Sequence, residues 1–300
     1  MLHKHRFGLS ILALPLLAGV AFGQTQAASP QSALPPALRA IFASQLASQL
    51  AAADTVTVSI SPGGVVPVYS SSTTVEPGSW VSIYGQNLAS GVATWNGDFP
   101  QQLGGTSVTV NGKPAYLWFV SPGQINLQAP DDPATGSVNV VVTNGNGSAT
   151  ATVTLGQFGP SWSLLDSKHV AGIIIRTDNS GAYAGGVYDI IGPTGSSLGY
   201  ATKAAKAGDT VELFAVGFGP TNPVVPAGHP FSSAAPLADP NSLRVTVGGT
   251  PITPDFAGMT GAGLFQINLK IPAGLGSGDL PLSAIVGGAS TPSGVVISVQ

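Results

Sequence analysis

The chain has 300 residues, of which only 8% are charged, and its formal net charge is −3. Its ten Lys and Arg residues are scattered, which argues against nucleic acid as a partner because that function needs a clustered basic face. There is no cysteine, so the fold contains no disulfide bond and must be stabilised by apolar burial.

Residues 1–23 have the three-part layout of a secretory signal peptide. Two basic residues precede an uncharged stretch over residues 7–22, and the small residues Ala21 and Gly23 precede a cleavage site. The apolar core is short for a membrane span of about 20 residues and contains Pro15. We therefore expect an exported chain, periplasmic, extracellular or at the cell surface, with no membrane span in its mature form.

Residues 24–54 form a leader in which a short amphipathic helix is predicted. Apolar residues between Leu38 and Leu50 recur at spacings of three and four, which is the period of a helix face. The helix either packs loosely on the first domain or docks on a partner. Loose packing is the preferred interpretation, because isolated helices of this length are marginal in water.

From Thr55 onward the apolar pattern changes to a period of two. Segments such as "SWVSIYG", "TSVTVNG", "QINLQA" and "SVNVVVT" have the length of strands and are bounded by turn residues. The pair Asn111-Gly112 is a strong hairpin signal, because both central positions of a type I′ turn need positive φ. Residues 55–157 are therefore predicted to form an antiparallel β-sandwich of immunoglobulin type.

Much of this pattern returns in the second half of the chain. The segments "VTVNGKP" and "GQINLQAP" recur as "VTVGGTP" and "FQINLKIP", which pairs Val108 with Val245 and Ile125 with Ile267. Residues 158–300 are predicted to form a second Ig-like sandwich with extra N-terminal strands. In both copies the two apolar residues of "QINL" should point into the core, with the amide side chains on the opposite face.

Aromatic residues are the candidates for recognition. In "AYLWFV" both faces of the strand are apolar, which indicates a buried central strand, Trp118 included, rather than a platform for sugars. Trp95 and Phe99 instead occupy a loop-like insertion, "ASGVATWNGDFPQQ". They either anchor a ligand or form a plug over the end of the sandwich, which is the preferred alternative. Trp95 and Phe99 are the binding residues predicted from the sequence.

Four segments resemble the uncharacterised Solibacter-type C-terminal domain family of exported bacterial proteins: "PGSWVSIYGQNLA", "LGGTSVTVNGKPAYLWFVSPGQINLQAP", "AVGFGPTNPVVPAG" and "GLFQINLKIPAGLGSGDLPLSAIVGG". The resemblance covers about residues 60–300. Each copy more weakly resembles the Ig-like domains called IPT/TIG, over residues 81–88 and 211–218. The resemblance implies two tandem antiparallel Ig-like (IPT/TIG-like) β-sandwiches on an exported or surface protein, and it brings no catalytic residues with it.

Motifs for catalysis or metal binding are weak. The segment "GSSLG" matches the nucleophile elbow of serine hydrolases around Ser197, with Asp209 and His229 following in the order of that fold. No helical pattern follows Ser197, so a turn is the preferred interpretation. The neighbours Asp131 and Asp132 could bind Ca²⁺ weakly, but carboxylates that cap a turn fit better. No catalytic residue, metal site or cofactor is predicted.

Two classes of function remain open after these exclusions. The first is an exported non-catalytic β-sandwich module that binds a protein or a glycan, or serves adhesion, at the bacterial cell surface. The alternative is a structural spacer that presents something else and has no ligand of its own. A serine hydrolase that uses Ser197 is the third and weakest alternative, since the sequence does not group the residues that it needs.

Overall fold

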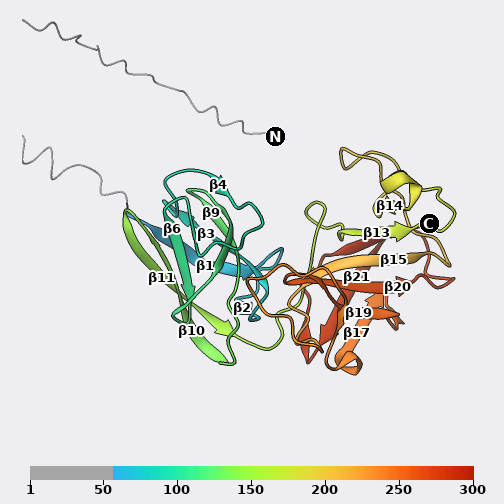
Figure 1. Ribbon diagram of the computed structural model, residues 1–300. Coiled ribbons are helices and arrows are strands. Elements are labelled where there is room, and N and C mark those ends of the chain that lie inside the picture. Colours follow the sequence, from blue (N-terminus) through green and yellow to red (C-terminus); the bar gives the residue numbers. More distant parts are fainter. Residues whose placement is uncertain (1–56) are drawn as a thin grey trace, which may run out of the picture. The chain divides into compact units, whose positions relative to one another are not determined.

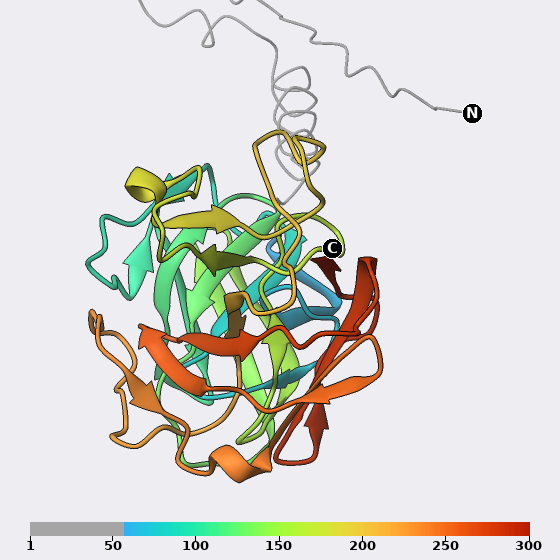
Figure 2. The same ribbon diagram turned by 90° about the vertical axis from the view of Figure 1, so that its right-hand side faces the viewer.

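The computed structural model describes residues 57–300. The predicted signal peptide and leader helix lie outside the described residues. The described part is all-β, with several antiparallel sheets and two short 3-10 helices, η2 (Ala184–Gly186) and η3 (Pro240–Ser242). Figures 1 and 2 show these sheets from two sides. The predicted fold class is confirmed.

Two sheets form the first sandwich. One has the strand order β1-β3-β9-β8-β4, and the other has the order β2-β11-β10-β6-β5 with β7 on β6. Only the pairing of β2 with β11 is parallel. The bounds are β1 Ser59–Pro67, β2 Thr74–Val75, β3 Trp80–Gln86, β4 Ala93–Thr94, β5 Gln102–Leu103, β6 Thr106–Val110, β7 Lys113–Pro114, β8 Tyr116–Val120, β9 Gln124–Gln128, β10 Gly136–Asn144 and β11 Gly147–Leu155.

The second sandwich has the same plan. One sheet has the order β14-β13-β15-β20-β19-β16 with β12 on β15, and the other has the order β18-β17-β21-β22 with β23 on β21. The bounds are β12 Ser161–Trp162, β13 Gly172–Ile175, β14 Tyr188–Ile190, β15 Thr210–Val216, β16 Ala235–Pro236, β17 Leu243–Val247, β18 Thr250–Ile252, β19 Phe256–Gly261, β20 Leu264–Lys270, β21 Gly278–Val286, β22 Ala289–Ser290 and β23 Val296–Val299.

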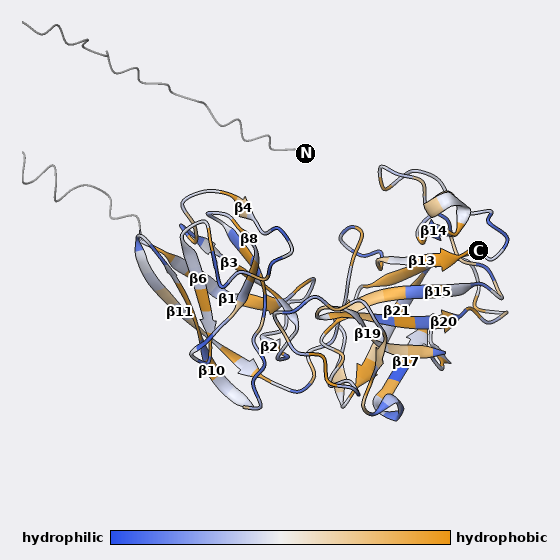
Figure 3. Ribbon diagram, in the orientation of Figure 1, coloured by the Kyte–Doolittle hydropathy of each residue, from blue (hydrophilic) through white to orange (hydrophobic). Residues whose placement is uncertain are grey.

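Each sandwich has its own core, made where its two sheets face each other. Period-two strands produce this arrangement, because alternate side chains point to opposite faces of a sheet. In β9 the side chains of Ile125 and Leu127 are fully buried, as are Ile267 and Leu269 in β20. Figure 3 shows hydrophobic residues alternating with hydrophilic ones along strands such as β20. The predicted direction of the "QINL" side chains is confirmed in both copies.

Strand pairing confirms that the repeated residues occupy equivalent positions. Ile125 pairs with Ile83 on β3, and Ile267 pairs with Leu213 on β15. Val108 on β6 faces β10, just as its counterpart on β17 faces β21. The repeat in the sequence is therefore a repeat of strand topology.

One hairpin shows how local sequence sets this topology. Asn111 and Gly112 connect β6 to β7 with φ values of 51° and 75°. Glycine adopts positive φ without steric cost, and asparagine does so more readily than most residues. The positive φ values predicted for this turn are therefore present.

Candidate functional site

Trp95 and Phe99, the binding residues predicted from the sequence, lie in the segment that follows β4. The Trp95 N–H donates to Trp118 O at 3.0 Å, and the Leu117 N–H donates to Pro100 O at 2.7 Å. The segment therefore leaves and rejoins one edge of β8. Phe99 is only 8% exposed, whereas Trp95 is half-buried.

Five aromatic rings form a cluster around this edge. Trp95 contacts Phe99 with ring centroids 4.6 Å apart, and Phe99 lies 6.4 Å from Tyr116. Trp80 on β3 lies 5.7 Å from Trp95 and 5.9 Å from Trp118. All four contacts are edge-to-face, the geometry that the ring quadrupole favours. Phe99 is the enclosed member, while Trp118 is the most accessible ring of those described here.

The expectation that Trp118 is buried is wrong, because this residue is 42% exposed. The register of β8 against β9 shifts between Leu117 and Phe119, which is the mark of a β-bulge. A bulge interrupts the alternation of side chains along a strand. As a result Val120 joins Leu117 in the core, both fully buried, whereas Trp118, the neighbour of Leu117, points outward.

Amide side chains lie beside these rings on the outer side of the sheet. Gln124 pairs in register with Tyr84, which is 44% exposed. The Gln124 amide nitrogen donates to Asn126 Oδ1 at 2.9 Å, and the Ser82 hydroxyl donates to the same oxygen at 2.8 Å. Within the described residues, Gln124 Oε1 and Asn126 Nδ2 make no hydrogen bond. We call this surface the aromatic–amide face; its members are Trp80, Tyr84, Trp118, Gln124 and Asn126.

The second sandwich closes one end of the aromatic–amide face. Trp80 Nε1 donates to Ala262 O at 2.7 Å. Gln128 is 1% exposed, and its amide donates to Gly78 O at 2.8 Å and accepts the Gly228 N–H at 3.0 Å. A ligand could therefore reach the part of the face between Tyr84 and Trp118, but not the Gln128 end.

A cleft of about 420 Å³ lies where residues of both sandwiches meet, and Glu76 lines it. The Glu76 side chain is nearly enclosed, and its Oε2 accepts the Gly219 N–H at 2.8 Å. Burial raises the pKa of Glu76 to about 8, although the hydrogen bond from Gly219 opposes this shift. Glu76 is therefore a neutral carboxyl at pH values well below 8.

The two aspartates considered for Ca²⁺ bind protein groups instead. Asp131 Oδ2 accepts the Ala227 N–H at 3.0 Å. Asp132 Oδ1 accepts the Ala134 N–H at 2.9 Å, and its carboxylate lies 3.4 Å from the Lys113 ammonium. Among the residues that the structure describes, no group of three or more His, Cys, Asp and Glu side chains could hold a metal ion.

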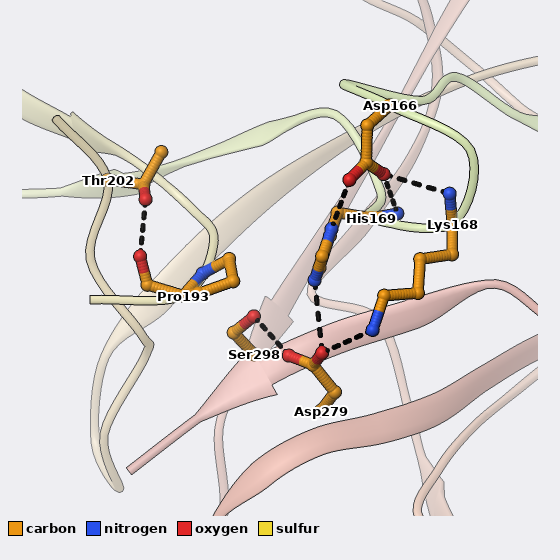
Figure 4. A network of polar contacts seen from close by, with 7 residues as sticks. All are labelled: Asp166, Lys168, His169, Pro193, Thr202, Asp279 and Ser298. Carbon is orange, nitrogen blue, oxygen red and sulfur yellow. Dashed lines mark hydrogen bonds and ion pairs between the residues drawn. The ribbon is translucent and has the colours of Figure 1, made fainter. Parts of the chain in front are cut away.

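A buried histidine stands between two carboxylates in the second sandwich (Figure 4). His169 Nδ1 lies 2.7 Å from Asp166 Oδ2, and His169 Nε2 lies 3.1 Å from Asp279 Oδ2. Asp279 also accepts from Lys168 Nζ at 2.7 Å and from the Ser298 hydroxyl at 2.8 Å. The Lys168 ammonium lowers the pKa of Asp279 to about 2. The Ser298 hydroxyl donates to a carboxylate and not to the imidazole. The network therefore joins residues 166–169 to β21 and β23 without activating a serine.

The hydrolase residues are not assembled. Ser197 lies on an exposed turn, and His229 is exposed as well. Asp209 accepts from Arg176 Nη1 at 3.0 Å and from the Lys206 N–H at 3.0 Å. In the described part of the chain no hydrogen bond joins Ser197 to a histidine.

No helix among residues 57–300 is long and apolar enough to cross a membrane.

Sequence reasoning missed most of the aromatic–amide face. A usable signal was present, because alternation opposite the buried Ile83 and Ile125 places Tyr84, Gln124 and Asn126 on the outer side. The bulge that puts Trp118 and Val120 on different sides of β8 carries no comparable signal, since it depends on how β8 pairs with β9.

Comparison with known proteins supports the fold. The family model described as IPT/TIG domain matches residues 53–158, less than half of the chain, and the first sandwich is an Ig-like TIG domain. No curated protein matches the sequence.

Several solved structures are similar to this chain at low sequence identity. A Bacteroides ovatus SGBP-B from a mixed-linkage glucan utilization locus, in complex with a heptasaccharide, is 12% identical, with a TM-score of 0.29 and coverage of 76% of this chain and 43% of that one. SGBP-B from a Bacteroides uniformis xyloglucan utilization locus is 15% identical, with a TM-score of 0.22 and coverage of 80% and 49%. The plexin A4 extracellular region is 12% identical, with a TM-score of 0.26 and coverage of 84% and 19%. The chain spans less than half the length of each protein, and at these scores the likeness carries no inference about function.

Proposed function

We propose that this protein is an exported, non-catalytic module that binds a neutral glycan through the aromatic–amide face of its first sandwich. The observation that carries the proposal is the exposure of two rings, Trp118 at 42% and Tyr84 at 44%, on either side of the Gln124–Asn126 amide pair. The proposal extends the sequence-based prediction for Trp95, whose ring contacts Trp80, which in turn contacts Trp118 in the same cluster.

The chemistry of the face complements a sugar. Aromatic rings offer large apolar surfaces with a negative face, which attracts the polarised C–H groups of a pyranose ring. A few well-placed polar groups orient a ligand in such a site. Gln124 Oε1 is free to accept from one hydroxyl and Asn126 Nδ2 to donate to another. No member of the face carries a formal charge, so a neutral glycan would bury no unpaired charge there.

Export rests on the sequence. The signal-peptide layout of residues 1–23 supports export of the mature chain from the cytoplasm, and the resemblance to the Solibacter-type family agrees with a bacterial exported or surface protein. Export is tested by detecting the mature N-terminus in the cell-surface or secreted fraction.

A structural spacer remains the alternative function. Its support is the set of hydrogen bonds that joins the two sandwiches, among them Trp80 to Ala262 and Gly219 to Glu76. A tandem held in this way could present another molecule at a defined distance. A spacer, however, has no need for exposed tryptophan beside unpaired amides, which is why we prefer the glycan-binding module.

Affinity electrophoresis through soluble polysaccharides tests this choice. The panel contains mixed-linkage β-glucan, xyloglucan and galactomannan as neutral chains, with alginate as an anionic comparison. We expect retention by at least one neutral polysaccharide, weakened in Trp118→Ala by roughly 30-fold, because a central aromatic contact contributes about 2 kcal/mol or more. Ile285→Ala is the matched control, since Ile285 is 47% exposed on a sheet of the second sandwich.

Two results would count against the proposal. Wild-type protein that no neutral polysaccharide retains would favour the spacer. Retention that Trp118→Ala and Tyr84→Ala leave unchanged, while both variants keep the thermal unfolding profile of wild type, would move the binding site away from the aromatic–amide face.

A further inference from the structure

The second sandwich carries a counterpart of the aromatic–amide face. On β20, Gln266 pairs in register with Phe214, as Gln124 pairs with Tyr84 in the first sandwich. These pairs stand at matching positions of the central strands, so each amide has an aromatic ring directly across the strand boundary.

The aromatic residue on the other side of the amide pair also has a counterpart in the second sandwich. Asn268 pairs with Phe256 on β19, as Asn126 pairs with Phe119 on β8. The Gln266 amide nitrogen donates to Asn268 Oδ1 at 2.9 Å, the same bond and distance as in the first sandwich. Each sandwich therefore holds one Gln–Asn pair between two aromatic residues.

The counterpart is partly open to solvent. Phe214, Gln266, Asn268 and Phe256 are all half-buried, while their strand neighbours point into the core. In the described residues Gln266 Oε1 and Asn268 Nδ2 make no hydrogen bond, so the same acceptor and donor are available as in the first sandwich.

Two differences separate the faces. The first sandwich has Trp118 at its bulge, and the second sandwich has no tryptophan on its amide-bearing face. Glu212 stands opposite Asn268, where Ser82 stands opposite Asn126. A carboxyl group can accept from a hydroxyl, but it opposes a second negative charge. The second face is thus suited to the same neutral ligand class, with a smaller stacking surface.

We propose that Phe214, Gln266, Asn268 and Phe256 form a second binding face for neutral glycans, so that the protein holds a polysaccharide at two points. This inference rests on the proposed function of the first face. Two linked contacts act cooperatively through effective concentration, which can raise the affinity for a long chain by a factor on the order of 10²–10⁴ over one contact. A short oligosaccharide that spans one face gains nothing from the second.

Titration calorimetry separates the two faces. The probes are mixed-linkage β-glucan, xyloglucan and galactomannan, each as polymer and as heptasaccharide. The proteins are the full mature chain, a first-face variant (Tyr84→Ala with Trp118→Ala), a second-face variant (Gln266→Ala with Asn268→Ala) and the Ile285→Ala control. The amide substitutions remove surface groups only, so the fold should be retained; thermal unfolding verifies this.

We expect two heptasaccharides per wild-type chain and one per chain in either face variant, with polymer affinity reduced at least 10-fold by each variant. Side-chain amide resonances of Gln266 and Asn268 should shift on addition of heptasaccharide to the first-face variant. One heptasaccharide per wild-type chain, with no effect of the second-face variant on polymer affinity, would overturn the second face and leave the proposed function standing. No binding of any probe by wild type would instead overturn the proposed function itself.

Discussion

Replacing Glu76 by Gln should change how the stability of this protein depends on pH. Glu76 is 6% exposed, and in the described residues its carboxyl group makes one hydrogen bond, from the Gly219 N–H. Asp131 and Asp132 line the same cleft, and none of the lining residues is basic. An ionised Glu76 would therefore be a buried charge without a counterion, which is why its pKa is raised from 4.5 to about 8.

The direction in which the stability changes with pH follows from which state of the chain keeps the Glu76 proton. Between pH 4.5 and 8 the folded chain keeps the Glu76 proton and the unfolded chain has lost it, so the free energy of unfolding falls as pH rises. The contribution of the neutral carboxyl is fully present below pH 4.5 and is lost as pH passes through about 8. At about 1.4 kcal/mol per pH unit, the loss is on the order of 4–5 kcal/mol.

Glu76→Gln keeps a neutral acceptor for Gly219 at every pH. We expect the variant to gain stability over wild type progressively between pH 5 and 8.5, reaching a few kcal/mol, as measured by urea unfolding at several pH values. Other titrating groups are shared by both proteins and cancel in the difference. Glu212→Gln, at the other glutamate of the chain, should show a smaller change of the same sign, because partial burial also raises the pKa of Glu212. Parallel pH profiles for wild type and Glu76→Gln would refute the reasoning.

Three further outcomes are expected. Ile125→Ala removes a fully buried side chain and should lower the free energy of unfolding by about 2–5 kcal/mol in urea titrations; an unchanged midpoint would place Ile125 outside the core. Asp279→Asn should destabilise the protein at pH 7 by about 1–3 kcal/mol, because it removes an acceptor of charge-assisted bonds, and the deficit should shrink as pH falls from 3.8 towards the wild-type pKa of about 2. A fluorophosphonate probe should leave Ser197 unlabelled; stoichiometric labelling that Ser197→Ala abolishes would restore the hydrolase alternative.

Local patterns in the sequence were enough to predict the strands and the repetition of their pattern in the second half of the chain. Period-two segments placed Ile125 and Ile267 in the core, and Asn111-Gly112 marked a hairpin whose two turn residues have positive φ. These features depend on residues within a few positions of one another, so the sequence reports them directly. The leader and signal peptide rest on the same kind of local evidence and lie outside the described residues.

The candidate site depended on contacts between distant segments. Trp118 does not share the buried side of Val120, because β8 bulges against β9 just after Leu117, and no composition or spacing signal marks that bulge. The rings of Trp95 and Trp80 meet only because the segment after β4 folds back along β8.

By itself, then, the sequence determined that this protein is all-β, built from two copies of one strand pattern, because alternation and turn chemistry act over short distances. Only the tertiary structure decided which outward side chains are accessible and which are covered. Glu76 is buried by Gly219, which lies 143 positions further along the chain, and Gln128 is enclosed by Gly228, which lies 100 positions further along. Such contacts form when the two repeats pack together. They join residues far apart in the chain, so no periodic pattern in the sequence indicates them.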